Sequence, residues 1–307
     1  MTEIEILNNK ITIPSKWEEL TPHQVKGVAW VLFKYENYFE IRYFLLHVLL
    51  GVKPYKPFQW FNKWYRLLNK CDYGAIAETL IRGMKDEHYY NELSDMGKEN
   101  YETALKKEVA NNPVAFLFNE CMIYKNPCPK LKNLHGPKDL LINITIGEFI
   151  YLEKKLAVIY TDNKVNMQEL DELCAILWRA KAKDYDVNDY TKNIDIREKF
   201  TDVTIPIRAK FFKSVSAYKK YAILLFITGC MNKFKDLYPL LFVTSKKKSS
   251  STSIGARFGW NGVLLQLSGK EFGDYNQTLY TRAHIIFQQL HILREKEIQN
   301  PTPQTTK

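Results

Sequence analysis

The first residues of the chain alternate between apolar and polar side chains on both sides of a polar Asn8–Asn9 pair. The alternating isoleucines are Ile4, Ile6, Ile11 and Ile13. A period of two is typical of a β-strand with one buried face, and Asn tolerates the positive φ of a tight turn. The pattern predicts a short β-hairpin, which Pro14 ends.

Most of the other apolar residues recur at intervals of three and four, the spacing of one face of an α-helix. Thr21 with Gln24, and Thr145 with Glu148, have the spacing of helix-capping boxes. One predicted helix begins at Pro22 and another at Pro57. The other predicted helices span about 39–50, 73–84, 146–159, 167–179, 206–228, 254–268 and 278–299. Residues 114–124 fit either a strand or a buried helix. The predicted fold is mainly α, with helical bundle units and a small N-terminal β-hairpin.

A polar stretch near 90–112 and the proline-rich loops at 126–137 interrupt the helical pattern. We therefore expect a domain of hairpin and helices at 1–90, a connecting region rich in loops at 91–140, and a C-terminal helical domain at 141–299. Residues 300–307 have the composition of a disordered tail.

The composition excludes several classes of protein. A hydrophobic content of 46% and an aromatic content of 14% exclude a disordered chain. Five cysteines at irregular spacing indicate buried thiols in a reducing compartment rather than a disulfide framework. The start lacks a signal-peptide pattern, and the most apolar stretches are shorter than the roughly 20 residues of a membrane helix. These features favour a cytoplasmic protein with no membrane partner.

Positive charge is concentrated in one part of the chain. Residues 203–257 hold eleven Lys or Arg and one acid, Asp236. The net charge of this segment, +10, equals the formal net charge of all 307 residues. Helical spacing places Lys210, Lys213 and Lys220 in one row on the predicted helix 206–228. The rest of the predicted basic patch consists of Lys246, Lys247, Lys248 and Arg257.

Such a patch suits either an acidic protein partner or the phosphates of nucleic acid. Phe211, Phe212 and Tyr218 have the spacing of core residues rather than that of a stacking surface between the lysines. An acidic protein partner or a solubilising face is therefore the favoured interpretation, and nucleic acid is the alternative.

Candidate metal and catalytic residues have unsuitable spacing. His284 and His291 lie seven residues apart on one helix, or roughly 10 Å, which is too far to share one ion. Cys121, Cys128 and His135 lack the spacing of a zinc knuckle. The chain also has no nucleophile elbow, phosphate loop or dinucleotide-binding turn. We expect no metal, no cofactor and no catalytic residues; an enzyme with scattered residues stays open and would show a polar pocket with perturbed ionisable groups.

Two patches resemble sequences from phage and prophage structural-gene clusters. The first is Ile-Pro-Ser-Lys-Trp-Glu-Glu-Leu-Thr-Pro-His-Gln at 13–24; the second is Gly-Trp-Asn-Gly-Val-Leu-Leu-Gln-Leu-Ser-Gly-Lys at 259–270. The second patch, with Phe272-Gly-Asp and the closing helix, is similar to the Trp-led helix pair of small tail-assembly chaperones. The resemblance implies a helical protein without enzymatic activity that holds the tape-measure protein during tail assembly. This chain is longer than those chaperones and has a hairpin domain in front.

These observations predict a non-catalytic, phage-type assembly or adaptor protein in the cytoplasm, the host cytoplasm if phage-encoded. Apolar side chains of a partner helix would enter a groove near Trp260, Leu264 and Leu267, and the lysines would attract an acidic flank. The alternative is a protein that binds nucleic acid without sequence preference through the basic segment 203–257.

Overall fold

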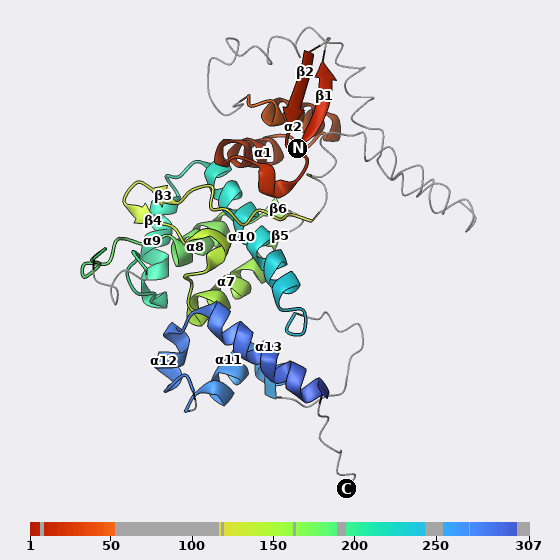
Figure 1. Cartoon of the computed structure of the whole chain (residues 1–307). Helices are drawn as coiled ribbons and strands as arrows, with labels where there is room; N and C mark the ends of the chain where they lie inside the picture. Colours follow the sequence, from red (N-terminus) through yellow and green to blue (C-terminus); the bar gives the residue numbers. More distant parts are fainter. Residues whose placement is uncertain are drawn as a thin grey trace. The chain divides into compact units, whose positions relative to one another are not determined.

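The computed structural model describes residues 1–6, 9–52, 117, 120–161, 164–188, 195–242, 254–269 and 271–299 (Figure 1). The protein is mainly α-helical, as the spacing of apolar residues predicts. The chain divides into two compact units, and each consists of two chain segments. Unit 1 comprises Met1–Pro127 and Ser216–Gly229, and unit 2 comprises Cys128–Val215 and Cys230–Lys307. The predicted helices at 57–68 and 73–84 lie outside the described residues.

Unit 1 begins with the predicted hairpin. Strands β1 (Thr2–Ile6) and β2 (Asn9–Ile13) pair antiparallel, with Thr2 opposite Ile13 and Ile6 opposite Asn9. The hairpin is confirmed, but Asn9 is the first residue of β2 rather than part of the turn. A short 3-10 helix, η1 (Trp17–Glu19), follows.

The two helices after η1 pack closely as an antiparallel pair. They are α1 (Pro22–Lys34) and α2 (Tyr38–Leu49). The predicted capping box at Thr21 is formed, and Gln24 Nε2 also donates to the Leu49 carbonyl at 3.0 Å. Gly27 permits the close packing, because a Cβ there would lie 2.8 Å from Val48 Cγ1.

The first part of α10 (Ala217–Leu237) completes unit 1. The Tyr221 ring lies 5.1 Å from the Phe33 ring, and Cys121 Sγ donates to the Leu225 carbonyl at 3.3 Å. Gly229 is a point of close approach, since a Cβ there would lie 2.2 Å from the Ile123 carbonyl oxygen. The predicted helix 206–228 would end just before Gly229, but α10 continues to Leu237. The glycine makes room for a neighbouring chain segment instead of capping the helix.

Unit 2 has small hairpins and several helices. Its hairpins are β3 (Lys130–Leu131) with β4 (Leu134–His135), and β5 (Tyr160–Thr161) with β6 (Lys164–Val165). Its helices, besides the end of α10, are η4 (Asp139–Leu141), α7 (Ile146–Val158), α8 (Met167–Leu177), η5 (Asp202–Thr204), α9 (Ile205–Phe212), α11 (Ile254–Leu267), α12 (Tyr275–Tyr280) and α13 (Ala283–Gln299). The predicted helices near 146–159 and 167–179 are confirmed as α7 and α8.

The core of unit 2 has two neighbouring parts. Helix α8 packs against α7 and α9 and is buried from Leu170 onwards except at Glu172. The Trp178 indole after it donates to the Cys128 carbonyl at 2.7 Å. The second part is a cluster of aromatic rings around Phe149, whose ring centroid lies 4.7 Å from that of Phe287 and 5.3 Å from that of Trp260. Both parts meet at α7, so α7 is the central helix of the unit.

Two predicted helices are broken in the structure. The predicted helix 206–228 divides into α9 and α10, because the chain turns at 213–216, where the Ser214 hydroxyl donates to the Phe211 carbonyl at 2.8 Å. The predicted helix 278–299 divides into α12 and α13. There Ile146 N donates to the Thr281 carbonyl and Ala283 N to the Ile144 carbonyl, each at 2.9 Å. A local hydrogen bond thus accompanies the first break, and long-range hydrogen bonds accompany the second.

The division into units differs from the predicted domains. The expected C-terminal domain at 141–299 includes Ser216–Gly229, which the structure groups with unit 1. Residues 128–140, expected in the connecting region, belong to unit 2 and form the β3–β4 hairpin and the start of η4.

Candidate functional site

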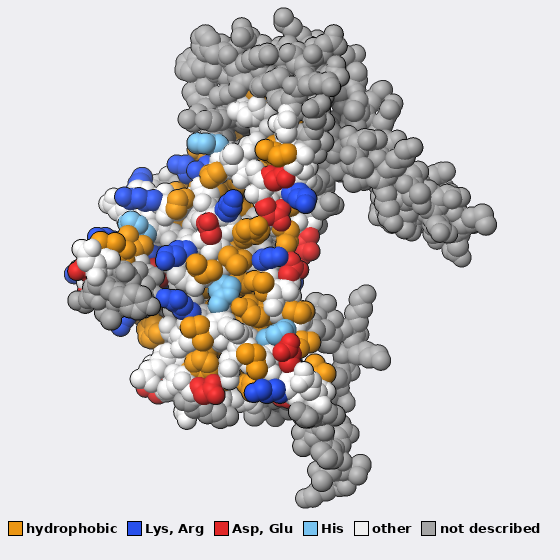
Figure 2. Space-filling view, viewed as in Figure 1, with side chains coloured by type: hydrophobic (Ala, Val, Ile, Leu, Met, Phe, Trp, Pro, Cys, Tyr) orange, Lys and Arg blue, Asp and Glu red, His pale blue; other side chains and the backbone are white. Residues whose placement is uncertain are grey.

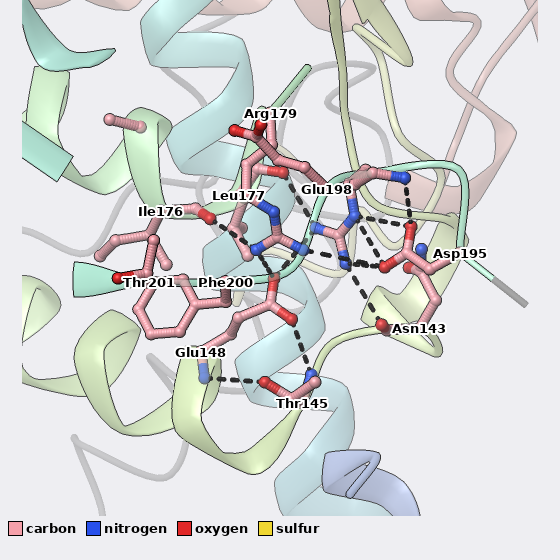
Figure 3. A network of polar contacts seen from close by, with 12 residues as sticks. Asn143, Thr145, Glu148, Ile176, Leu177, Arg179, Asp195, Glu198, Phe200 and Thr201 are labelled. Atoms are coloured by element: carbon pink, nitrogen blue, oxygen red, sulfur yellow. Dashed lines mark hydrogen bonds and ion pairs between the residues drawn. The ribbon is translucent and has the colours of Figure 1, made fainter. Parts of the chain in front are cut away.

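Glu148 lies at the centre of a buried network of charged side chains in unit 2 (Figure 3). The capping box of α7 fixes its position: Thr145 Oγ1 accepts from Glu148 N at 3.2 Å, and Glu148 Oε2 accepts from Thr145 N at 2.9 Å. The other carboxylate oxygen, Oε1, lies 2.5 Å from Arg179 Nη1 and 3.1 Å from Arg197 Nη1. One buried carboxylate therefore faces two buried guanidinium groups.

The two arginines connect three segments of unit 2. Arg197 donates to the Leu177 carbonyl at 2.9 Å and to the Asn143 carbonyl at 3.2 Å, and its Nη2 lies 2.7 Å from Asp195 Oδ2. Burial lowers the pKa of Arg179. For Arg197, burial also acts against the charged form, but the charges and hydrogen bonds of Glu148 and Asp195 outweigh it and raise its pKa. The network therefore holds charged arginines in the interior.

A third arginine extends this network towards α9. Arg208 donates from Nε to the Ala175 carbonyl at 2.9 Å and from Nη1 to Glu198 Oε1 at 3.0 Å. Within the network, Arg179 Nε and Arg208 Nη2 are buried without a hydrogen-bond partner among the described residues. Each carboxylate of the network faces an arginine, so the arrangement is suited to joining α7, α8 and α9 rather than to acid–base chemistry.

The predicted partner groove is part of the core of unit 2. Leu264 and Leu267 are 0% and 8% exposed, and Trp260 is half-buried, with its ring in contact with those of Phe149 and Phe287. Leu264 and Leu267 are thus buried within the chain's own core, whereas contact of a partner with Trp260 stays a prediction. Helical spacing reveals a buried face, but it does not show whether the face contacts another protein or the chain's own core.

The prediction that Lys210, Lys213 and Lys220 form one row on a single helix is wrong. The chain turns between Lys213 and Lys220, and Lys220 is only 4% exposed. Lys210 and Lys213 are exposed, as predicted. Lys246, Lys247 and Lys248 lie outside the described residues, and Arg257 is described only by its place in α11.

Lys210 and Lys213 lie close in sequence to two exposed aliphatic side chains. Val203 in η5 and Ile207 in α9 are 76% and 67% exposed and are four residues apart, on one side of the chain. We call Val203, Ile207, Lys210 and Lys213 the α9 face. It combines apolar surface with positive charge, which is the chemistry that the predicted groove was expected to supply.

A second basic surface lies at the β3–β4 hairpin, outside the basic segment 203–257. Lys130 is paired directly with His135, and Lys132 begins the two-residue turn. Burial lowers the pKa of His135, and the positive charges of Lys130 and Lys181 lower it further. Lys130 and Lys181, from two segments, therefore lie near His135, and Lys132 belongs to the same hairpin. Their sequence positions give no signal, because Lys181 is distant along the chain.

Two half-buried aromatic rings lie beside these lysines. Lys132 Nζ is 5.2 Å from the centroid of the Phe211 ring, and Lys181 Nζ is 5.2 Å from that of Tyr185. Phe211 belongs to α9, so the fold brings together lysines and rings that are separated in the sequence.

The histidines and cysteines considered for metal binding have other contacts. His284 Nδ1 lies 3.1 Å from Tyr238 Oη and its Nε2 lies 3.2 Å from the Leu140 carbonyl oxygen, whereas His291 Nε2 is 3.5 Å from Glu295 Oε1. Burial raises the pKa of the Cys121 thiol to about 11. Among the described residues, no three His, Cys, Asp or Glu side chains are close enough to hold a metal ion.

Unit 1 has a hollow of about 280 Å³, open to solvent, next to η1. Its walls are mostly apolar, with one acid and one lysine: Trp17, Glu18, Leu20, Pro22, Val25, Ile123, Tyr124 and Lys125. This composition is that of a shallow surface depression rather than of a site where several ionisable groups converge.

None of the helices in the described part of the chain is both long enough and apolar enough to cross a membrane. Comparison of the chain with protein-family models, curated proteins and solved structures gives no match.

Proposed function

We propose that the protein is a non-catalytic, phage-type assembly or adaptor protein whose α9 face binds an amphipathic, acidic segment of another protein. The observation that supports the proposal most directly is the exposure of Val203 and Ile207, at 76% and 67%, beside two exposed lysines. Burial of two aliphatic side chains in an interface is favourable, and each contributes about 1.5 kcal/mol or more.

The lysines give the α9 face its preference for one kind of partner. Lys210 lies three residues after Ile207 and Lys213 follows one turn later, so both flank the apolar side chains. Charges at the rim of an interface increase the rate of association and select a partner of opposite charge. A helix with two or three apolar residues and an acidic flank fits this arrangement.

The phage-type part of the proposal rests on the sequence resemblance at 13–24 and 259–270. The second of these patches contains Leu264 and Leu267, which are core residues of unit 2, and the half-buried Trp260. In this proposal the similar residues maintain the helical scaffold, and the α9 face makes the contact with the partner.

Pairwise co-purification with the products of the genes next to its own tests the proposal. We expect one of these proteins to co-purify with the wild-type chain and to be lost with Ile207→Glu, because a carboxylate replaces the exposed aliphatic side chain. Ile285→Glu is the matched control, since Ile285 in α13 is also aliphatic and 47% exposed. Retention of the partner by Ile207→Glu, or equal loss with both variants, would contradict the proposal.

A further inference from the structure

The basic surface at the β3–β4 hairpin has the components of a site for single-stranded nucleic acid. We call Lys130, Lys132, His135 and Lys181, with the rings of Tyr185 and Phe211, the hairpin face. Figure 2 shows Lys and Arg side chains gathered around the place where Figure 1 labels β3 and β4. The face shares no residue with the α9 face and is independent of the proposed function.

We propose that the hairpin face binds single-stranded nucleic acid without sequence preference, with phosphates on the lysines and bases against the two rings. Burial lowers the pKa of His135 most, and Lys130 and Lys181 lie near enough for their positive charges to lower it further. A site with surplus positive charge of this kind attracts phosphate groups.

The rings favour single-stranded nucleic acid over an acidic protein. Each ring is half-buried, so one part is fixed by packing and another part is accessible. Lys132 and Lys181 each hold an ammonium group 5.2 Å from a ring centroid. A base that stacks on the ring would displace the ammonium group, which then reaches the adjacent phosphate. Alternation of aromatic rings and cations is the pattern of surfaces that bind single strands.

The backbone at Lys132 supports a role for this side chain beyond folding. Its φ is 51°, in the left-handed region that glycine adopts without strain. A lysine at the first position of a two-residue turn is therefore less favourable for the hairpin than a glycine. Lys132→Gly is a useful variant, because it removes a charge from the hairpin face while favouring the turn.

Fluorescence anisotropy with a labelled oligothymidylate of about 16 nucleotides tests the proposal. We expect binding at about 50 mM salt, with an affinity that falls as salt is added and a slope that decreases by about 0.7 for each lysine removed. Lys130→Gln, Lys181→Gln and Lys132→Gly should each weaken binding, and Lys132→Gly should also raise the midpoint of thermal unfolding.

The chain offers a matched control for both charge and ring. Lys154 Nζ lies 5.4 Å from the centroid of the Tyr151 ring, and Tyr151 donates a hydrogen bond to Asp202 at 2.5 Å. This pair has the same lysine–aromatic geometry but shares no residue with the hairpin face. Lys154→Gln and Tyr151→Leu should leave oligothymidylate binding unchanged, whereas Phe211→Leu and Tyr185→Leu should weaken it about fivefold or more.

An abasic oligomer of the same length separates base stacking from simple charge attraction. We expect it to bind at least about fivefold more weakly than oligothymidylate, because it has no bases for the rings. The proposal is overturned if oligothymidylate does not bind, if the abasic oligomer or a duplex binds as tightly, or if the control variants have the same effect as the hairpin-face variants. Ile207→Glu should leave oligothymidylate binding intact, so failure of this proposal and failure of the adaptor proposal are distinguishable.

Discussion

At the scale of single residues, Glu148 has the most demanding position in the described structure. It caps α7, is fully buried and faces both Arg179 and Arg197. Removing one charged side chain from a buried network leaves its partners' charges unpaired, which lowers the free energy of unfolding by about 3–5 kcal/mol. We expect Glu148→Gln to lower the free energy of unfolding by about 3 kcal/mol or more, measured by urea denaturation.

The control for Glu148→Gln is a surface pair of the same chemistry. Arg294 Nη1 lies 2.7 Å from Glu297 Oε2, and both side chains are more than half exposed, at 61% and 65%. Exposed pairs contribute about 1 kcal/mol at most, so Glu297→Gln should change stability little. A similar effect of the two substitutions would show that the buried network does not stabilise unit 2.

At the scale of elements, Gly229 shows that packing, rather than helix propensity, decides what one position tolerates. Gly229→Ala in a helix would stabilise the protein by about 1 kcal/mol if only propensity mattered. A Cβ at Gly229 would, however, lie 2.2 Å from the Ile123 carbonyl oxygen, and backbone atoms cannot move aside easily. We therefore expect Gly229→Ala to lower the midpoint of thermal unfolding.

Gly27→Ala is the comparison, and it should lower the midpoint less, because its Cβ would meet the side chain of Val48 rather than backbone atoms. A higher midpoint for Gly229→Ala would contradict the close approach of Ile123.

The elements themselves could largely be predicted from the sequence where the signal is local. The capping boxes at Thr21 and Thr145 and the hairpin of β1 and β2 depend on neighbouring residues, and all three are formed. The breaks in the predicted helices 206–228 and 278–299 depend on distant or competing hydrogen bonds. Thr281 and Ala283 bond to the segment before α7, which no periodicity in the sequence indicates.

At the scale of the whole molecule, the candidate sites were less predictable than the fold. The stripe of Trp260, Leu264 and Leu267 has the same spacing whether it contacts a partner or the core, and only tertiary packing distinguishes the two. The hairpin face gives no signal in the charge distribution along the chain, because only folding brings Lys181 near His135 and Phe211 near Lys132. The distribution of charge along the sequence therefore indicates the exposed Lys210 and Lys213 but not the hairpin face.

The stability of the whole molecule should fall with acid because buried histidines favour the neutral form. Burial lowers the pKa of His284, whose Nδ1 accepts from the Tyr238 hydroxyl while its Nε2–H donates to the Leu140 carbonyl. The unfolded chain thus binds a proton more readily, so stability is lost as pH falls through the unfolded pKa of about 6.5 towards the lower folded value. Burial lowers the pKa of His47 as well.

We expect the midpoint of thermal unfolding to decrease between pH 7.5 and pH 5, and we expect His284→Gln to make this decrease smaller. His23→Gln, a change at an exposed side chain, should leave it unchanged. An identical pH dependence for wild type and His284→Gln would show that His284 does not couple folding to proton binding.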